Sequence, residues 1–262
     1  MAELLIRNSS VGFIKAIIFD KDGTLLNTEE YLLELAKARI AFSENKFKRL
    51  KINKIKIWLL RRMLVSIYGI KKNLLSANAS LAIASREQNI ISTATIFTLF
   101  GFDWFKSLSI GQEIFDEVDN FLSNKKEPPQ KTKDLILGAL DLLVSLKKEK
   151  ICIALMTNDT QGGIDEFICE NNLGGIFDYS WSAENKPSKP NPKAVIELCK
   201  KMNLHPSECA LISDADTDLK MAKEADIALV IGFTGGWRNP PNLTEKQILI
   251  QKLNELKIQR NT

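Results

Sequence analysis

The chain has 262 residues, of which 45% are hydrophobic and 26% are charged. This balance is typical of a protein that buries a sizeable core, either as one large domain or as a core domain that carries a smaller one. The net charge of +4 is too small to indicate a nucleic-acid partner. A single histidine, His205, leaves almost nothing from which a zinc site or a histidine-based catalytic triad could be built.

The hydropathy of the sequence predicts neither a membrane partner nor export. No apolar run reaches the roughly 20 residues that cross a bilayer, and the N-terminus, MAELLIRNSSVGF, lacks the pattern of a signal peptide. The four cysteines form no C-x-x-C pair, and each lies in or beside an apolar segment. We therefore expect buried, reduced thiols in a cytoplasmic protein.

The first strong structural signal is an apolar run over residues 15–19, which predicts a buried parallel strand ending at Asp20. More than a hundred residues then separate Asp22 from Thr157, whereas a crossover between parallel strands needs only about a dozen. Most of this stretch has helical periodicity, so we interpret residues 27–127 as a helical domain inserted after the first strand. Helices are expected at residues 31–45, 54–68, 74–87, 92–99 and 110–122, and a proline-containing linker at 124–129.

The second half of the chain alternates apolar runs with helical patterns, which is typical of a parallel α/β sheet with helices on both faces. Residues 1–26 and 128–262 would form this core, and its tail over residues 244–259 is predicted to be an amphipathic helix. Strands are expected at residues 151–156, 177–181, 209–213 and 227–231, and helices at 131–148, 163–171, 192–203 and 215–224.

Two carboxylates separated by one residue, Asp20 and Asp22, follow the first strand directly. In that position they can serve different roles, because Asp20 can attack phosphorus while Asp22 protonates the leaving oxygen and then activates water. Gly23 permits a tight turn that directs both side chains into one pocket. The strand context argues against an ordinary turn or a fragment of a calcium loop.

Two further segments could hold the phosphate group of a substrate. Thr157 and Asn158 follow the second core strand, where a hydroxyl and backbone N–H groups can bind phosphate oxygens, although Thr-Asn is also an ordinary turn pair. Lys189 lies between prolines in KPSKPNP, and its ammonium could neutralise the nucleophile and the transferring phosphoryl group. Taken alone, Lys189 would be interpreted as a solvated loop lysine.

Acidic residues also follow the fourth core strand, at Asp214, Asp216 and Asp218. Beside Asp20 and Asp22 they would repel one another unless a cation lay among them, and oxygen ligands next to a phosphate favour Mg²⁺. Asp214, at the strand end, is best placed to bind the metal directly. Asp218 lies one helical turn further and would support the site, whereas Asp216 could face solvent and is left out.

Taken in order, the segments FDKDGTL, TN, KPNP and SDADTDLKMA resemble the four signature motifs of the haloacid dehalogenase superfamily. The resemblance spans residues 14–26 and about 130–235 and is specific, because four motifs occur in order on the expected elements. It implies a Rossmann-like α/β core with the first and fourth strands side by side. The helical insertion then resembles an all-helical cap of the C1 type, and the core resembles the phosphoglycolate phosphatase and β-phosphoglucomutase branch.

The resemblance implies that Asp20 is a nucleophile that forms an aspartyl-phosphate and also binds Mg²⁺. Asp22 would be the general acid/base, with its backbone carbonyl as a metal ligand. An aspartate at this position favours phosphate monoesters, because dehalogenases and phosphonate hydrolases of the family usually lack it. Ser213 departs from the glycine that usually precedes the fourth-motif aspartate, and a serine should fit there at little cost.

The remaining motif residues match the family's phosphate-binding and metal-binding positions. Thr157 and Asn158 match the second motif and Lys189 matches the catalytic lysine of the third, so all three would bind the substrate's phosphate. Asp214 and Asp218 match the acidic fourth motif and would belong to the metal site. The expected cofactor is therefore Mg²⁺, and the expected partner is a small-molecule phosphate ester.

These observations predict a Mg²⁺-dependent phosphohydrolase of small phosphate monoesters. A sugar-phosphate phosphomutase is the alternative, because the motifs do not encode whether the phosphoryl group passes to water or to a second substrate oxygen. A non-catalytic binding protein is disfavoured, because such proteins usually lack a catalytic acid and this chain retains every motif acid. The cap contains no recognised specificity motif, so the substrate is not predicted.

One segment of the cap, residues 46–62, carries eight basic residues and no acid. A solvated helix face with its apolar side packed inward is the favoured interpretation, because charge runs usually face solvent. An electrostatic funnel for a multiply charged substrate and a surface for nucleic acid or acidic membrane are the alternatives. The basic residues are Lys46, Lys48, Arg49, Lys51, Lys54, Lys56, Arg61 and Arg62.

Overall fold

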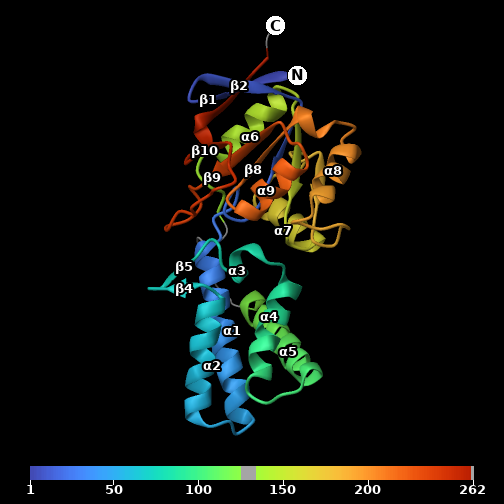
Figure 1. Cartoon of the computed structure of the whole chain (residues 1–262). Coiled ribbons are helices and arrows are strands. Elements are labelled where there is room, and N and C mark those ends of the chain that lie inside the picture. Colours follow the sequence, from blue (N-terminus) through green and yellow to red (C-terminus); the bar gives the residue numbers. More distant parts are fainter. Residues whose placement is uncertain (125–133, 261–262) are drawn as a thin grey trace. The chain divides into compact units, whose positions relative to one another are not determined.

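The computed structural model describes residues 1–124 and 134–260 (Figure 1). The chain divides into two compact units, which we call the core unit, Met1–Thr28 with Lys133–Thr262, and the helical unit, Glu29–Thr132. The first division falls close to the boundary proposed between residues 26 and 27. The boundary proposed between 127 and 128, and the predicted linker beyond residue 124, lie outside the described residues.

A six-stranded parallel sheet forms the centre of the core unit, which confirms the predicted α/β fold. The strand order is β10-β9-β8-β3-β6-β7, so the first core strand, β3, lies between β8 and β6. This places the first-motif and fourth-motif strands side by side, as expected. The strands are β3 (Ala16–Phe19), β6 (Cys152–Met156), β7 (Tyr179–Trp181), β8 (Cys209–Ser213), β9 (Leu229–Phe233) and β10 (Ile248–Ile250).

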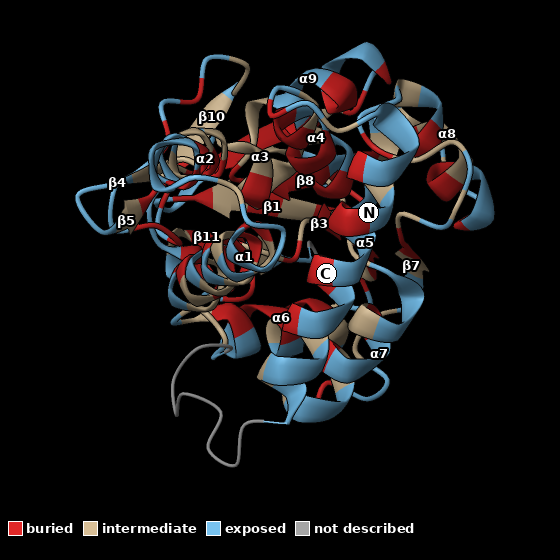
Figure 2. Cartoon of the chain, turned by 90° about the horizontal axis from the view of Figure 1, so that it is seen from below, coloured by how far each residue is buried: buried red, intermediate tan, exposed pale blue. Residues whose placement is uncertain are grey.

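Helices cover both faces of this sheet. Ile17 and Phe19 of β3 belong to a buried apolar cluster that includes residues of α6 (Ala139–Lys148) and α7 (Gln161–Glu170). The alternating residues Ala16 and Ile18 belong to a second cluster, with residues of α8 (Pro192–Lys201) and α9 (Asp216–Glu224). The central strands are therefore buried on both sides (Figure 2), which explains why they are continuous apolar runs.

A second, antiparallel sheet in the order β11-β1-β2 joins the two ends of the core unit. It consists of β1 (Ala2–Ile6), β2 (Ser9–Ile14) and β11 (Leu256–Gln259). The helix predicted over residues 244–259 is therefore wrong, since this stretch forms β10, a 3-10 turn at Leu253–Glu255 and β11. Pairing of β10 with β9, and of β11 with β1 near the other end of the chain, overrides the local helical periodicity.

The helical unit contains α1 (Glu29–Arg49), α2 (Lys54–Ile67), α3 (Ser80–Ile83), α4 (Arg86–Thr98) and α5 (Trp104–Ser123). The helix predicted over residues 74–87 is only partly confirmed: α3 lies within this range and α4 begins at Arg86, but β5 (Leu74–Leu75) forms a hairpin with β4 (Ile70–Lys71). Lys72 and Asn73, between the two strands, have φ values of 50° and 61°. Two successive left-handed residues are the signature of a tight hairpin turn, so the chain is extended where the predicted helix would begin.

Other expectations concern the cysteines and the membrane. The four cysteines are unpaired, and Cys199 and Cys209 are buried as expected, but Cys169 is exposed, so the prediction that all are buried is wrong. Among the described residues, no helix combines the length and apolar character that crossing a bilayer requires.

Aromatic side chains form the core of the helical unit where α1 ends. Phe47 is fully buried, and its ring lies 5.2, 5.5 and 5.4 Å from the rings of Phe97, Phe100 and Phe102. The chain turns between α4 and α5 at Phe100 and Phe102, so this cluster fixes the α4–α5 connection against the end of α1.

Replacing Phe47 with alanine should therefore destabilise the helical unit. We expect a loss of about 3–5 kcal/mol, because a buried phenylalanine leaves both lost contacts and a cavity. Urea unfolding followed by circular dichroism would measure it. Phe105→Ala is the matched control, since Phe105 is 82% exposed and its loss should cost no more than about 0.5 kcal/mol. Equal effects of the two substitutions would contradict the packing described here.

Candidate active site

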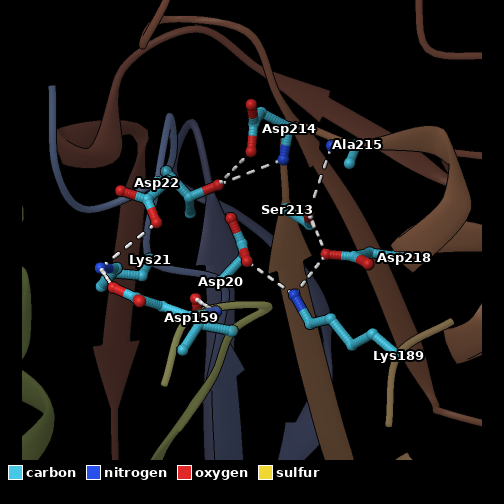
Figure 3. A network of polar contacts seen from close by, with 11 residues as sticks. Asp20, Lys21, Asp22, Asp159, Lys189, Ser213, Asp214, Ala215 and Asp218 are labelled. Carbon is cyan, nitrogen blue, oxygen red and sulfur yellow. Dashed lines mark hydrogen bonds and ion pairs between the residues drawn. The ribbon is translucent and has the colours of Figure 1, made fainter. Parts of the chain in front are cut away.

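The carboxyl ends of β3 and β8 bring the first and fourth motifs together (Figure 3). Phe19 and Ile212 pair between the two strands, and the backbone N–H of Asp20 donates to the carbonyl of Ile212 at 3.0 Å. Asp20 and Asp214 therefore project from neighbouring strand ends. This edge of an open parallel sheet is where such folds place their ligands.

Lys189 reaches into this edge from the loop that precedes α8. Its Nζ atom lies 2.6 Å from Oδ1 of Asp20 and 2.6 Å from Oδ2 of Asp218, and its side chain is only 2% exposed. Burial alone would lower the pKa of Lys189, but the two carboxylates outweigh it and raise the pKa. The lysine is therefore a buried, charged group that links the nucleophile position to the fourth motif.

The loop that carries Lys189 is held by its own neighbours. The indole N–H of Trp181, at the end of β7, donates to the carbonyl of Pro187 at 3.0 Å. On the other side, the side chain of Asn191 accepts from the N–H of Lys193 and begins α8, with Pro192 in the first turn. These contacts explain how a lysine between prolines becomes buried instead of solvated.

Ser213 orients Asp218 from within the fourth motif. Its hydroxyl donates to Oδ2 of Asp218 at 2.9 Å and accepts from the N–H of Ala215 at 3.2 Å. The serine that replaces the family's usual glycine thus holds the carboxylate that faces Lys189. Asp216 does not join the site: its carboxylate accepts hydrogen bonds from Thr244 and from the N–H of Glu245, and so fixes a surface turn.

Asp214 is buried and held by two neutral donors. The hydroxyl of Thr24 donates to Oδ1 at 3.0 Å, and the indole N–H of Trp237 donates to Oδ2 at 2.5 Å. Burial raises the pKa of Asp214 to about 6, although the hydrogen bonds from Trp237 and Thr24 lower it. Burial likewise raises the pKa of Asp20, opposed mainly by the charge of Lys189.

Glycines bring these segments into close contact. Gly23 has a φ of 79°, and a Cβ atom there would lie 2.3 Å from Oδ2 of Asp214 and 2.6 Å from Nε1 of Trp237. A Cβ atom on Gly236 would lie 2.0 Å from the carbonyl oxygen of Gly23. The loop after β9 therefore packs directly on the first motif, and only glycine fits at either position.

Lys21 and Asp159 are site residues that sequence reasoning missed. Lys21 is almost fully buried, and its Nζ atom lies 2.5 Å from Oδ2 of Asp159 and 3.3 Å from Oδ2 of Asp22. Burial would lower the pKa of Lys21, but Asp22 and Asp159 raise it. The only sequence feature that could have indicated these two residues is their position next to a motif. Lys21 separates the two first-motif acids, and Asp159 follows the second motif. Trp237 carried no such signal, because it lies far from every motif in the sequence.

The second motif ends β6 beside the first. The N–H of Thr157 donates to the carbonyl of Trp181 at 2.9 Å, and its hydroxyl accepts from the N–H of Asp159 at 3.1 Å. Thr157 is buried and Asn158 is half-buried. Since β6 is adjacent to β3, both residues lie at the same sheet edge as Asp20.

The donor set at this edge fits a hard cation. Among residues 1–124 and 134–260, no three acidic, histidine or cysteine side chains converge as a ready-made metal site. Within the same described residues, however, no basic side chain pairs with Asp214, although it is buried. Asp20, Asp214 and the backbone carbonyl of Asp22 could together supply the oxygen ligands that Mg²⁺ prefers. The cation would then balance the negative charge of the Asp214 carboxylate.

A sequence model of the haloacid dehalogenase-like hydrolases matches residues 14–226. The chain belongs to this family. The match confirms the enzyme class that the four motifs predicted, that of the haloacid dehalogenase-like hydrolases.

Similar proteins include phosphatases and a mutase. The phosphoglycolate phosphatase 1 of Pseudomonas aeruginosa is 28% identical over 103 residues, which cover 38% of this chain and 38% of that protein. A predicted phosphoglycolate phosphatase from Haemophilus somnus has a TM-score of 0.61 at 20% identity and covers 91% and 95% of the two chains. The β-phosphoglucomutase of Clostridium difficile has a TM-score of 0.58 at 20% identity, with 94% of each chain covered. The two structures show a shared fold.

The metal-free protein should lose stability as the pH rises through the titration of Asp214. Its pKa is raised from 3.8 to about 6 on folding, so between these values the folded chain holds a proton that the unfolded chain has released. The free energy of unfolding in EDTA should therefore fall as the pH rises through this window. Urea unfolding at a series of pH values would measure it.

Asp214→Asn should reduce that fall, because the substituted side chain does not titrate. Asp216→Asn is the matched control. Burial acts to raise the pKa of Asp216, but hydrogen bonds from Glu245 and Thr244 outweigh it and lower the pKa on folding, so Asp216 does not cause a fall in stability as the pH rises. The Asp216→Asn variant should show the same decrease in the free energy of unfolding with rising pH as the wild type. The same pH dependence in wild type and Asp214→Asn would contradict the role of burial.

Proposed function

We propose that the chain is a Mg²⁺-dependent hydrolase of small phosphate monoesters that acts through an aspartyl-phosphate on Asp20. The observation that supports this most directly is the buried ion pair between Asp20 and Lys189, at 2.6 Å, on the ligand-binding edge of the sheet. Burial raises the pKa of Asp20, and the positive charge of Lys189 opposes that rise. The lysine therefore favours the anionic form of Asp20, which is the form that can attack phosphorus.

Each step of the proposed reaction has a residue of this chain to perform it. A carboxylate oxygen of Asp20 forms a bond to phosphorus while the bond to the ester oxygen breaks, and Asp22 gives that oxygen a proton. Asp22 then removes a proton from a water molecule, which attacks phosphorus, releases inorganic phosphate and restores Asp20. Lys189 neutralises charge on Asp20 and on the phosphoryl oxygens throughout.

The phosphoryl group would be held by the second motif and by the cation. The hydroxyl of Thr157 and the side chain of Asn158 are proposed as donors to its oxygens. When bound by Asp20, Asp214 and the carbonyl of Asp22, Mg²⁺ would supply charge stabilisation to the transferring group. Asp218 is proposed to act on this site mainly through Lys189 and Ser213, with which it shares short hydrogen bonds.

A phosphomutase is the second candidate, because the fold is shared equally with a β-phosphoglucomutase and with a phosphoglycolate phosphatase. In that reaction the aspartyl-phosphate passes to a second substrate oxygen instead of to water. A panel of phosphate esters would separate the two, since a mutase would form isomeric sugar phosphates with little free phosphate. A non-catalytic role fits less well, because the nucleophile, acid/base, lysine and metal-site positions are all occupied by suitable residues.

Asp20→Asn should abolish Mg²⁺-dependent release of phosphate from p-nitrophenyl phosphate, with a loss of at least about a thousandfold in kcat. An amide cannot form the acyl phosphate. Asp216→Asn makes the same chemical change next to the fourth motif and should retain activity, because Asp216 binds only the Thr244–Glu245 turn. Full activity of Asp20→Asn would refute the proposed nucleophile.

Trp237→Phe should weaken Mg²⁺ binding by about tenfold, which is the low end of the effect of removing a hydrogen-bond partner from a metal-binding side chain. The substitution keeps an apolar ring but removes the donor to Oδ2 of Asp214. Isothermal titration calorimetry with Mg²⁺ would measure the change in Kd. Trp58→Phe is the control, since Trp58 lies in the helical unit and is 55% exposed. An unchanged Kd in Trp237→Phe would show that this hydrogen bond does not support the metal site.

A further inference from the structure

The second helix of the helical unit exposes an apolar stripe. Ile55, Trp58 and Leu59 are 78%, 55% and 45% exposed, and their spacing places them on one face of α2, with Arg62 one turn further. The opposite face, which includes Leu60 and Leu64, is buried. The helix therefore has two apolar faces, of which only one is used for packing within the unit.

Exposed aromatic and aliphatic residues also surround the α4–α5 connection. Leu99 and Phe105 are 68% and 82% exposed, and Trp104 is 42% exposed. This connection lies beside the end of α1, because the ring of Phe47 contacts those of Phe100 and Phe102. We call the surface formed by residues 48–62 and 99–106 the cap-end surface.

Most of the basic side chains of the 46–62 segment remain uncompensated on the cap-end surface. Lys46 pairs with Glu113 and Arg61 with Glu44. Within the described part of the chain, the other six form no ion pair, and all six are exposed. Arg62 lies over the ring of Trp58 at 5.0 Å. The only acid in these two segments is Asp103, which caps α5.

We propose that the cap-end surface is a peripheral docking site for a membrane rich in anionic phospholipid. An anionic bilayer offers a negative surface for the lysines and arginines and an apolar layer for side chains such as Ile55 and Phe105. Trp58 and Trp104 suit the boundary between these layers. A nucleic acid would match the charge and could stack on the aromatic rings, but it offers no environment for exposed isoleucine and leucine.

This inference departs from the expectation of no membrane partner, which rested on the lack of a spanning segment. Peripheral binding needs no such segment, because exposed apolar side chains and basic charge act together at the interface. It is independent of the proposed phosphatase reaction, since none of its residues belongs to the site at the sheet edge.

Cosedimentation with vesicles would test the proposal. The intact protein should bind vesicles of phosphatidylcholine mixed with phosphatidylserine, should not bind vesicles of phosphatidylcholine alone, and should be released as the salt concentration rises. Lys54→Gln combined with Lys56→Gln should weaken binding by about tenfold or more, since each basic charge near the surface contributes several-fold.

Lys71→Gln combined with Lys72→Gln is the matched charge control. These lysines are also exposed in the helical unit, but their hairpin lies near the start of α1, where the N–H of Leu75 bonds to Glu29. The helix α1 is 21 residues long and so separates its two ends by about 30 Å. The control pair should therefore leave vesicle binding unchanged.

Ile55→Ser combined with Phe105→Ser tests the apolar contribution and should also weaken binding about tenfold or more, by removing exposed apolar area. Leu137→Ser is the control, because Leu137 is 93% exposed in the core unit. Melting temperatures of all variants would verify folding.

Three results would overturn the proposal. Wild-type protein that fails to bind phosphatidylserine vesicles at low salt would exclude membrane docking without any variant. Weakening by the lysine pair but not by the apolar pair would assign a surface for polyanions in general. Tighter binding to a mixed-sequence oligonucleotide than to vesicles would assign nucleic acid instead.

Discussion

The positive charge of Lys189 compensates two acids of the active-site edge, Asp20 and Asp218. Its ammonium lies 2.6 Å from Asp20 and from Asp218, and each of these groups would carry a large desolvation cost if its partner were missing. The three come from the end of β3, from the loop before α8 and from α9. The sheet, the loop and the helix must therefore be in place together before any of the charges is stabilised.

Asp214 has a different environment from that of Asp20 and Asp218. It receives hydrogen bonds from Thr24 and Trp237 and no ion pair within the described residues, so its charge is oriented but not balanced. One side of the site is thus compensated internally by a lysine, while in the proposed reaction a bound cation would compensate the other. A cation held by Asp214 would add positive charge beside that of Lys189, and the proposed phosphoryl transfer needs such charge to stabilise the negative oxygens of the phosphoryl group.

Five of the six strands of the parallel sheet and the four motifs could be predicted. The strands β3, β6 and β8 are apolar runs, and the first, second and fourth motifs follow them directly. The hairpin at residues 70–75 and the strands after residue 244 could not be predicted, because their apolar residues fit a helical period and strand pairing decides the outcome. The strand β4 pairs locally with β5, whereas β10 and β11 pair with β9 and β1. Lys21 and Asp159 were next to recognised motifs but become a pair only when β3 and β6 align. Trp237 meets Asp214 through backbone contact between two glycines, which no spacing rule reveals.

The contact between Gly236 and Gly23 also determines where this domain can be shortened. The family match ends at residue 226, yet the loop that touches the first motif, the indole that holds Asp214 and the strand β10 that borders β9 all follow it. A fragment trimmed to the matched region would keep every signature residue but would lose the loop, the indole and the strand that hold these residues in position. For this chain, the smallest unit that can carry the chemistry is larger than the region that identifies it.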